Sequence, residues 1–188
     1  MLCSGRLTTP IGAMFAVADD RGLVLCEFHD RPFLPTQLKR VERICGGKPV
    51  AAEHPYLDQT QRELDEYFLG QRETFTIPLL LDGTPFQGSV WQQLLNIPFG
   101  KTLSYDDVAT RIGRPGGARA VGRANGDNRI AIIVPCHRVI NSDGSLAGYG
   151  GGKRRKRWLL AHERRGVQLS LIPEFDQESV NPGIDDNF

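Results

Sequence analysis

Cys136 stands directly before His137 and Arg138 in the run Pro135-Cys136-His137-Arg138. The thiol of a free cysteine has a pKa of about 8.5, so at neutral pH it becomes a nucleophile only when cationic or hydrogen-bonding neighbours assist it. An imidazole and a guanidinium are neighbours of that kind. The competing interpretation is a buried, inert thiol, because cysteine is among the residue types most often found in protein interiors.

Glu163, in the pair His162-Glu163, is a carboxylate that could complete a catalytic arrangement. Thiol nucleophiles are activated by a base that a third group orients, and Glu163 would orient His137 for that task. The alternative is a surface carboxylate paired with Arg164 or Lys156. The sequence by itself leaves both alternatives open.

Cys26 and His29, spaced as C-x-x-H, offer two metal ligands, and Cys3 offers a third. A structural zinc site needs four ligands and no fourth is evident, so we expect no metal and no other cofactor. We assign no catalytic role to His29 or His54. The four cysteines are sparse and irregularly spaced, which indicates reduced thiols rather than a disulfide framework.

The chain has 188 residues, of which 40% are hydrophobic and 24% charged. These proportions are typical of globular proteins and exclude a fibrous or wholly disordered chain. No apolar run approaches the ~20 residues of a membrane span, and the N-terminus lacks the pattern of a secretory signal. We therefore expect a cytoplasmic protein without membrane contact.

The formal net charge of +1 hides an uneven distribution. Residues 1–84 carry 9 Lys and Arg against 12 Asp and Glu, a charge of −3. Residues 85–170 carry 14 against 5, a charge of +9, and residues 171–188 carry 0 against 5, a charge of −5. The +9 segment predicts a polyanion such as nucleic acid as the partner, and a merely solvated basic surface is the alternative.

The first part of the chain predicts a small α+β domain over residues 1–84. Its expected elements are an antiparallel hairpin of residues 12–18 and 23–28, helices at 35–45 and 55–69, and a strand at 74–81 interrupted by Pro78. The turn of the hairpin calls for a positive φ angle at Gly22.

Turn residues at 81–85 mark the boundary to a second, mostly helical domain, residues 85–170. Its first expected elements are a helix containing Phe86, Val90 and Leu94, a helix at 104–112 capped by Ser104, a tight turn at 113–117 and a helix at 118–125. Helix, tight turn and helix form the helix-turn-helix pattern of DNA-binding proteins.

The helix at 118–125 consists of small side chains and two arginines, Arg119 and Arg123. Small side chains let a backbone approach a neighbour closely. That neighbour is either another helix, in ordinary close packing, or a nucleic-acid groove into which the arginines reach.

The run Ile130–Val134 is short and β-branched, and it predicts a buried strand that leads to Cys136. We then expect a turn at 141–144, a glycine-rich loop at 146–152 that is too flexible to serve packing, and a basic amphipathic helix at 153–165. Residues 171–188 are acidic and aperiodic, which predicts a disordered tail.

These motifs together resemble a known family. Its pattern is matched, in order, by Ala118-Arg119-Ala120-Val121-Gly122, Pro135-Cys136-His137-Arg138-Val139, Gly148-Tyr149-Gly150-Gly151-Gly152 and Trp158-Leu159-Leu160-Ala161-His162-Glu163. Over residues 85–167 the chain is similar to the O6-alkylguanine-DNA alkyltransferases, also called methylated-DNA-protein-cysteine methyltransferases. Residues 1–84 resemble the variable N-terminal domain of that family through T-P-I-G, G-L-V-L and L-D-E-Y-F-x-G.

The resemblance implies a two-domain α+β fold. A small antiparallel sheet with helices, similar to ribonuclease H, would form the N-terminal domain, and a mostly helical domain with a helix-turn-helix would follow. It also implies a monomer that acts on double-stranded DNA, needs no cofactor and repairs O6-alkylguanine, with O4-alkylthymine as a possible second substrate.

The resemblance further implies a role for each residue of the site. Cys136 would accept the alkyl group irreversibly, so that each molecule acts once, and His137 would deprotonate the thiol through a water. Glu163 would orient His137, Asn128 would brace the site, and Tyr105 would donate to the base and help to turn it out of the duplex. The implied DNA-binding residues are Ala118, Arg119, Ala120, Gly122 and Arg123, together with Tyr105, and Arg119 would replace the extruded base. The implied pocket residues are Pro135, Gly148, Tyr149, Gly150 and Gly151.

Two positions depart from the family pattern. Arg129 follows Asn128 where the family usually has proline, and Asn125 stands where some members have a hydrophobic pocket residue. Arg129 should loosen the turn before the predicted strand, and Asn125 bears on the size of alkyl group that fits.

Two other functions compete with alkyl transfer. A module that recognises alkylated bases without repairing them would lack the acceptor cysteine, whereas Cys136 is present. A cysteine hydrolase that uses Cys136 and His137 would have no use for a helix-turn-helix on a +9 surface. The number of turnovers per molecule distinguishes all three.

Overall fold

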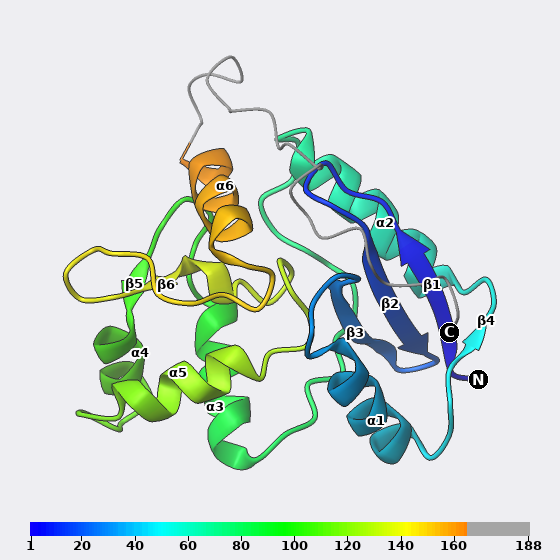
Figure 1. Cartoon of the computed structure of the whole chain (residues 1–188), viewed down its shortest axis with the longest axis horizontal. Coiled ribbons are helices and arrows are strands. Elements are labelled where there is room, and N and C mark those ends of the chain that lie inside the picture. The colour runs from blue at the N-terminus through cyan, green and yellow to red at the C-terminus, as the bar shows by residue number, and fades with distance from the viewer. Residues whose placement is uncertain (165–188) are drawn as a thin grey trace.

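The computed structural model describes residues 1–164. The chain forms a sheet domain and a helical domain that lie side by side (Figure 1). In the first domain the elements are β1 (Cys3–Leu7), β2 (Met14–Asp19), β3 (Gly22–Phe28), α1 (Leu34–Cys45), β4 (Val50–Ala51) and α2 (Pro55–Phe68). In the second they are α3 (Pro85–Leu95), β5 (Leu103–Ser104), α4 (Tyr105–Arg111), α5 (Ala118–Gly126), the 3-10 helix η1 (Cys136–Arg138), β6 (Val139–Ile140) and α6 (Lys153–Glu163). The predicted two-domain α+β class is confirmed.

The sheet has the strand order β3-β2-β1-β4, with β1, β2 and β3 antiparallel and the short β4 parallel to β1. Helix α1 packs on one face, where Val17, Val24 and Leu25 form a small core with Leu34 and Val41 of the helix. Helix α2 covers the other face, whose apolar residues are continuous with the core of the helical domain. The two domains therefore share one interior.

The predicted hairpin of β2 and β3 is confirmed, and so is the positive φ of +145° at Gly22. A Cβ atom at Gly22 would collide with the backbone of Pro78, so glycine is required there for two reasons. β1 and β4 were not predicted. β1 carries glycine and polar residues between its apolar ends, which hides the alternation that marks a strand.

The expected strand at 74–81 was wrong. Leu79 makes a single parallel bridge to Leu23, through bonds from Leu23 N to Pro78 O (2.8 Å) and from Leu80 N to Leu23 O (2.9 Å). Pro78 has no amide hydrogen with which to extend the ladder. The amide of Thr76 instead donates to the carboxylate of Glu63 on α2 (2.8 Å).

The expected strand at Ile130–Val134 was also wrong, although all five residues are buried. Ile130 bridges to Cys26 of β3, and the chain then turns at Ile132, which has a φ of +71°. The bond from Val134 N to Ile130 O (3.0 Å) closes this turn. The β-branched side chains reflect burial here and not strand formation.

The helix-turn-helix is formed by α4, the turn at 112–117 and α5. Ser104 caps α4 as predicted, since its hydroxyl accepts from Asp107 N (3.0 Å) while Asp107 accepts from Ser104 N (2.9 Å). α3 packs against α5, and Trp91 Nε1 donates to the carbonyl of Ala124 (2.9 Å). These contacts hold α5 with one face outward.

The predicted turn at 141–144 is present, with a bond from Gly144 N to Asn141 O (2.9 Å). α6 is confirmed to Glu163, and its predicted end at Arg165 and the predicted disordered tail lie outside the described residues. The helices of residues 1–164 include none long and apolar enough to cross a membrane.

Candidate active site

A cavity of about 570 Å³ opens beside Cys136. Its walls come from the start of α4, from α5, from η1 and from the loops after β6. The predicted site residues that line it are Tyr105, Ala118, Arg119, Gly122, Cys136, Gly148, Tyr149 and Gly150. Asn125, the position that departs from the family pattern, lines it as well.

Cys136 is the first residue of η1 and is 6% exposed. Nδ2 of Asn128 donates to its Sγ atom at 3.1 Å and also to the carbonyl of Val134 at 2.9 Å. Oδ1 of Asn128 accepts from Ile130 N at 3.0 Å, which fixes the orientation of the amide. Burial raises the pKa of the Cys136 thiol to about 11, although the Asn128 bond lowers it, so the thiol rests protonated at neutral pH.

His137 and Glu163 form a buried pair, with Nε2 of His137 2.6 Å from Oε1 of Glu163. Arg138 donates to the same carboxylate through Nε (2.8 Å) and Nη2 (3.0 Å). Burial alone would raise the pKa of Glu163, but His137 and Arg138 hold it far below its usual range. The surface-carboxylate alternative for Glu163 is therefore wrong.

Glu163 is ionised and can only accept hydrogen bonds, so the hydrogen of His137 lies on Nε2. Burial lowers the pKa of His137 despite the pull of Glu163, so the ring is neutral and Nδ1 carries a free lone pair. Among residues 1–164, Nδ1 of His137 has no hydrogen-bond partner. The arrangement can accept a proton at this atom.

Tyr105 begins α4 and lies over Gly122 of α5, where an added Cβ would be 3.8 Å from the Tyr105 ring. Burial and the nearby Cys136 raise the pKa of Tyr105, so its hydroxyl keeps its proton and can donate. Arg119, Ala120 and Arg123 are exposed on α5. Of these three, Arg119 lines the cavity, whereas Ala120 and Arg123 do not.

The glycine-rich loop is packed tightly at two positions, so the expectation that it has no packing role was wrong. A Cβ at Gly151 would lie 2.5 Å from the Phe28 ring, and a Cβ at Gly150 would lie 2.5 Å from Cζ of Arg31. Tyr149 packs edge-on against His137, with ring centres 6.4 Å apart. Lys156, whose pKa burial lowers to about 8, donates to the carbonyls of Val139 (2.7 Å) and Gly148 (3.4 Å).

Two predicted pocket residues lie elsewhere. Pro135 lines a separate cavity with Ile133 and Arg138. Gly151 is a buried residue of the glycine-rich loop that packs against Phe28 and does not line the cavity beside Cys136.

Several residues that shape the site were missed from the sequence. Tyr67 donates to Oε1 of Glu163 (2.8 Å) and the amide of Gly100 donates to Oε2 (3.2 Å). Arg31 donates to the turn that carries Asn128. Tyr67 lies in the L-D-E-Y-F-x-G motif, which was the one available signal, and nothing local marks Arg31.

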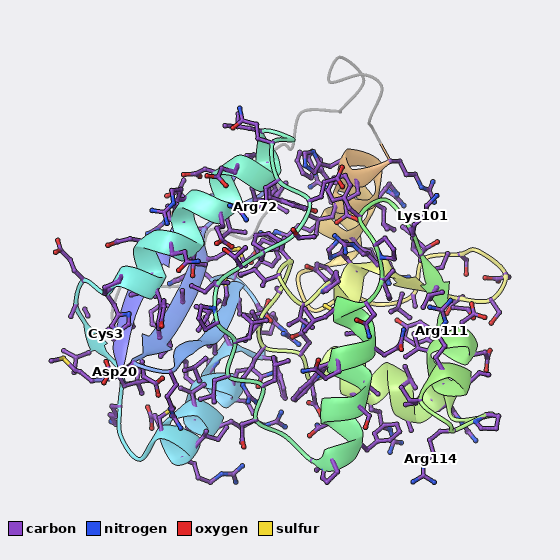
Figure 2. The ribbon with its side chains drawn as sticks, turned by 180° about the vertical axis from the view of Figure 1, so that it is seen from behind. Cys3, Asp20, Arg72, Lys101, Arg111 and Arg114 are labelled. Carbon is purple, nitrogen blue, oxygen red and sulfur yellow. The ribbon has the colours of Figure 1, made fainter. Side chains whose placement is uncertain are left out.

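Cys3, Cys26 and His29 do not form a metal site. In residues 1–164, no three His, Cys, Asp or Glu side chains are grouped so that they could hold a metal ion. Figure 2 shows Cys3 near Asp20, at the end of the sheet domain that is far from the helical domain. On the opposite side of the molecule, Arg111 and Arg114 mark the exposed basic surface of α4 and the turn after it (Figure 2).

Comparison with known proteins gives matches over both domains. Residues 3–81 match the ribonuclease-like domain of 6-O-methylguanine DNA methyltransferase, and residues 85–165 match its DNA binding domain. A methylated-DNA-protein-cysteine methyltransferase from Mycobacterium leprae is 43% identical over 171 residues, which cover 91% of this chain and 98% of that protein. A protein of the same name from Shigella flexneri is 41% identical, with 86% and 95% covered.

Solved structures agree with these matches. The O6-methylguanine methyltransferase of Mycobacterium tuberculosis has a TM-score of 0.75 at 39% identity, with 92% of this chain and 100% of that chain covered. The structure of Mycobacterium tuberculosis OGT in complex with DNA has a TM-score of 0.73 at 41% identity, with 85% and 91% covered. The chain therefore belongs to the 6-O-methylguanine DNA methyltransferase family.

Proposed function

We propose that this protein repairs DNA by direct reversal, transferring the alkyl group of O6-alkylguanine to Cys136 as a monomer that reacts once. The observation that carries the proposal is the neutral His137, whose Nε2 contacts Glu163 and whose Nδ1 has no partner within residues 1–164, next in the chain to a thiol that Asn128 holds at a cavity. Relatives that bear the name methylated-DNA-protein-cysteine methyltransferase support it.

The proposed transfer is a displacement at the alkyl carbon. Sγ of Cys136 forms a bond to that carbon while the bond from carbon to O6 breaks, and the electron pair passes to the guanine. The thiol proton moves to Nδ1 of His137 through a bridging water, and the departing guanine takes up a proton from solvent. His137 then returns its proton to solvent, so the net change is that the thiol proton is replaced by the alkyl group and the guanine gains one proton. Because the thiol rests protonated, a neutral base has to remove its proton before or during the attack.

Tyr105 and Asn128 have separate proposed tasks. The Tyr105 hydroxyl donates to the guanine ring as negative charge develops there, and Asn128 donates to the sulfur as it gains charge. The thioether that results is stable, so the protein is consumed as it reacts.

Guanine O6 lies inside the base pair, so the damaged nucleotide has to leave the duplex before it can reach Cys136. The small residues of α5, of which Ala120 is exposed and Ala118 and Gly122 are half-buried, support a minor-groove approach. Arg119 borders the cavity and would fill the gap in the base stack. Arg123 would contact phosphate, as would the exposed arginines of α4 and the following turn.

Intact-protein mass spectrometry tests the proposal directly. After mixing with an equimolar duplex that contains one O6-methylguanine, the protein should gain the mass of one CH₂ group, mapped to Cys136, and should gain no more with excess duplex. The Cys136→Ala variant should bind the same duplex but keep its mass. Binding without a mass gain in the unsubstituted protein would indicate a recognition module, and repeated product formation without a mass gain would indicate a hydrolase.

A further inference from the structure

Arg31 is a residue of the N-terminal domain that reaches the reaction site in the C-terminal domain. It follows β3 and is 7% exposed. Its Nη1 atom donates to the carboxylate of Glu27 and to the carbonyl of Asn128 (3.1 Å), and its Nη2 atom donates to the carbonyl of Gly126 (2.7 Å). One planar guanidinium thus spans three acceptors in two domains.

The two carbonyls belong to the turn that leads from α5 to the Cys136 segment. Gly126 ends α5, and Asn128 carries the amide that donates to Sγ of Cys136. The side chain of Asn128 is held by Val134 and Ile130, so its backbone carbonyl is the remaining point at which the residue could shift. The hydrogen bond from Nη1 of Arg31 to this carbonyl restrains that shift.

The same guanidinium also abuts the cavity wall. A Cβ atom at Gly150 would lie 2.5 Å from Cζ and 2.8 Å from Nη2 of Arg31, so the loop packs directly on this group. Arg31 therefore contacts the end of the DNA-facing helix, the turn of the thiol's hydrogen-bond donor and the pocket loop.

Glu27 forms an ion pair with Arg31, and both side chains are buried. A buried ion pair of this kind adds little to the free energy of unfolding. The side chain of Glu27 is 1% exposed and also accepts from the amide of Phe28 (3.0 Å). Removing two charges from water costs about as much free energy as their attraction returns, so a buried pair is weak evidence for a stabilising role. A role in positioning accounts for the pair better.

We propose that Arg31 is a positioning residue for alkyl transfer, which holds Asn128 against the thiol of Cys136 and Gly150 at the pocket wall. The inference rests on the proposed function, because the reaction that it assists is the transfer to Cys136. It assigns to the N-terminal domain an indirect part in the chemistry of the C-terminal domain, through the position of Asn128.

The test compares three variants in single-turnover transfer. Glu27→Gln with Arg31→Met removes both charges together, so no unpaired charge is left buried and the fold should survive. Misplacing a reacting group by about 1 Å costs up to about a hundredfold in rate, and we expect roughly ten- to a hundredfold slower transfer from this double variant. Arg31→Lys keeps the charge pair but cannot bond all three acceptors, and it should be intermediate.

Arg40→Ala is the matched control. Arg40 also joins the N-terminal domain to the same turn, but through a half-exposed ion pair with Oδ1 of Asp127 (3.0 Å). We expect its transfer rate to stay within about twofold of the unsubstituted protein, because exposed ion pairs contribute little.

Two further readouts separate positioning from stability. The double variant should react more slowly with free O6-benzylguanine and with duplex DNA, and by the same factor for both. When Cys136→Ser is added to prevent the reaction, the affinity of the double variant for duplex DNA should be unchanged. Reaction of Cys136 with iodoacetamide, followed by mass spectrometry across pH, should reach half its maximum at a higher pH than in the unsubstituted protein. A purely structural role would change the melting temperature and leave these readouts unaltered.

Equal transfer rates in the double variant, the Arg31→Lys variant and the unsubstituted protein would overturn the inference and leave the proposed function intact. Absence of any transfer to Cys136 in the unsubstituted protein would instead overturn the proposed function. If the double variant fails to fold, the decision rests on Arg31→Lys, whose charge pair is preserved.

Discussion

The hydroxyl of Tyr67, on α2 of the N-terminal domain, donates to Oε1 of Glu163, on α6 of the C-terminal domain, at 2.8 Å. The same oxygen accepts from Nε2 of His137, so Tyr67 is one bond removed from the base of the proposed reaction. Tyr67 is fully buried among aromatic rings that include Phe99 and His162. The orientation of His137 therefore depends on packing between the two domains.

Replacing Tyr67 with Phe should slow transfer by roughly three- to tenfold, because the carboxylate loses a donor worth about 1 kcal/mol and can shift away from His137. The ring remains, so the aromatic packing is kept. The measurement is the single-turnover rate as a function of pH, in which the decline on the acid side should also move. A lower melting temperature with an unchanged rate and pH profile would show that Tyr67 serves packing alone.

Replacing Arg119 with Ala should slow repair of duplex DNA by roughly tenfold while leaving the reaction with free O6-benzylguanine within about twofold. The reason is that Arg119 would hold the space of the extruded base, a task that exists only in duplex DNA. Arg123→Ala is the control on the same helix, and it should weaken binding to damaged and undamaged duplex alike. Equal losses on both substrates for Arg119→Ala would contradict a role in base extrusion.

Acid should destabilise the folded protein from about pH 6.5 downward. The pKa of His137 is lowered in the folded chain, so near pH 6.5 the unfolded chain binds a proton that the folded chain does not bind. The free energy of unfolding therefore falls as the pH falls. The lowered pKa of Glu163 acts in the same direction below about pH 4.5, where the unfolded carboxylate is protonated. Each such proton lowers the free energy of unfolding by up to about 1.4 kcal/mol per pH unit.

Urea midpoints measured at pH 7.5, 6.5 and 5.5 would check this prediction, with His137→Gln as the control whose midpoint changes less. A midpoint that rises on acidification would mean that His137 is protonated in the folded state. It would then be unable to accept the thiol proton.

Gly151→Ala should lower the free energy of unfolding by about 1–3 kcal/mol, because its methyl group would meet the buried Phe28 ring. Gly148→Ala is the matched control in the same loop. A Cβ there has nothing within 4 Å, so the change should stay within about 0.5 kcal/mol. Thermal melts of the two variants test this prediction. Equal melting temperatures for Gly151→Ala and Gly148→Ala would mean that the loop can shift to accommodate the methyl group without loss of stability.

Local signals were enough to predict much of the fold. The β2–β3 hairpin, α1, α2 and the helix-turn-helix each have a clear period, a cap or a glycine turn, and each was found. The two false strands at 74–81 and 130–134 arose because burial produces apolar runs whether or not the backbone pairs. β4 is two exposed residues long and carries no detectable pattern.

The residues proposed to react could be singled out because their types and order are distinctive, whereas the residues that support them could not. Tyr67 and Glu163 are 96 positions apart, and Arg31 and Asn128 are 97 apart. Neither contact has a counterpart in the local sequence, since a buried tyrosine or arginine looks the same whether it packs or positions. Both contacts form where the two domains pack together, and that packing exists only in the folded chain.

The raised pKa of Cys136 also bears on how long an unreacted molecule lasts. With a pKa of about 11, on the order of one molecule in ten thousand carries a thiolate at pH 7, against about 3% for an ordinary cysteine. Peroxides oxidise thiolates to sulfenic acids far faster than they oxidise thiols. If the sulfur can be used only once, as proposed, a low thiolate fraction should slow its loss to oxidants before it meets a damaged base.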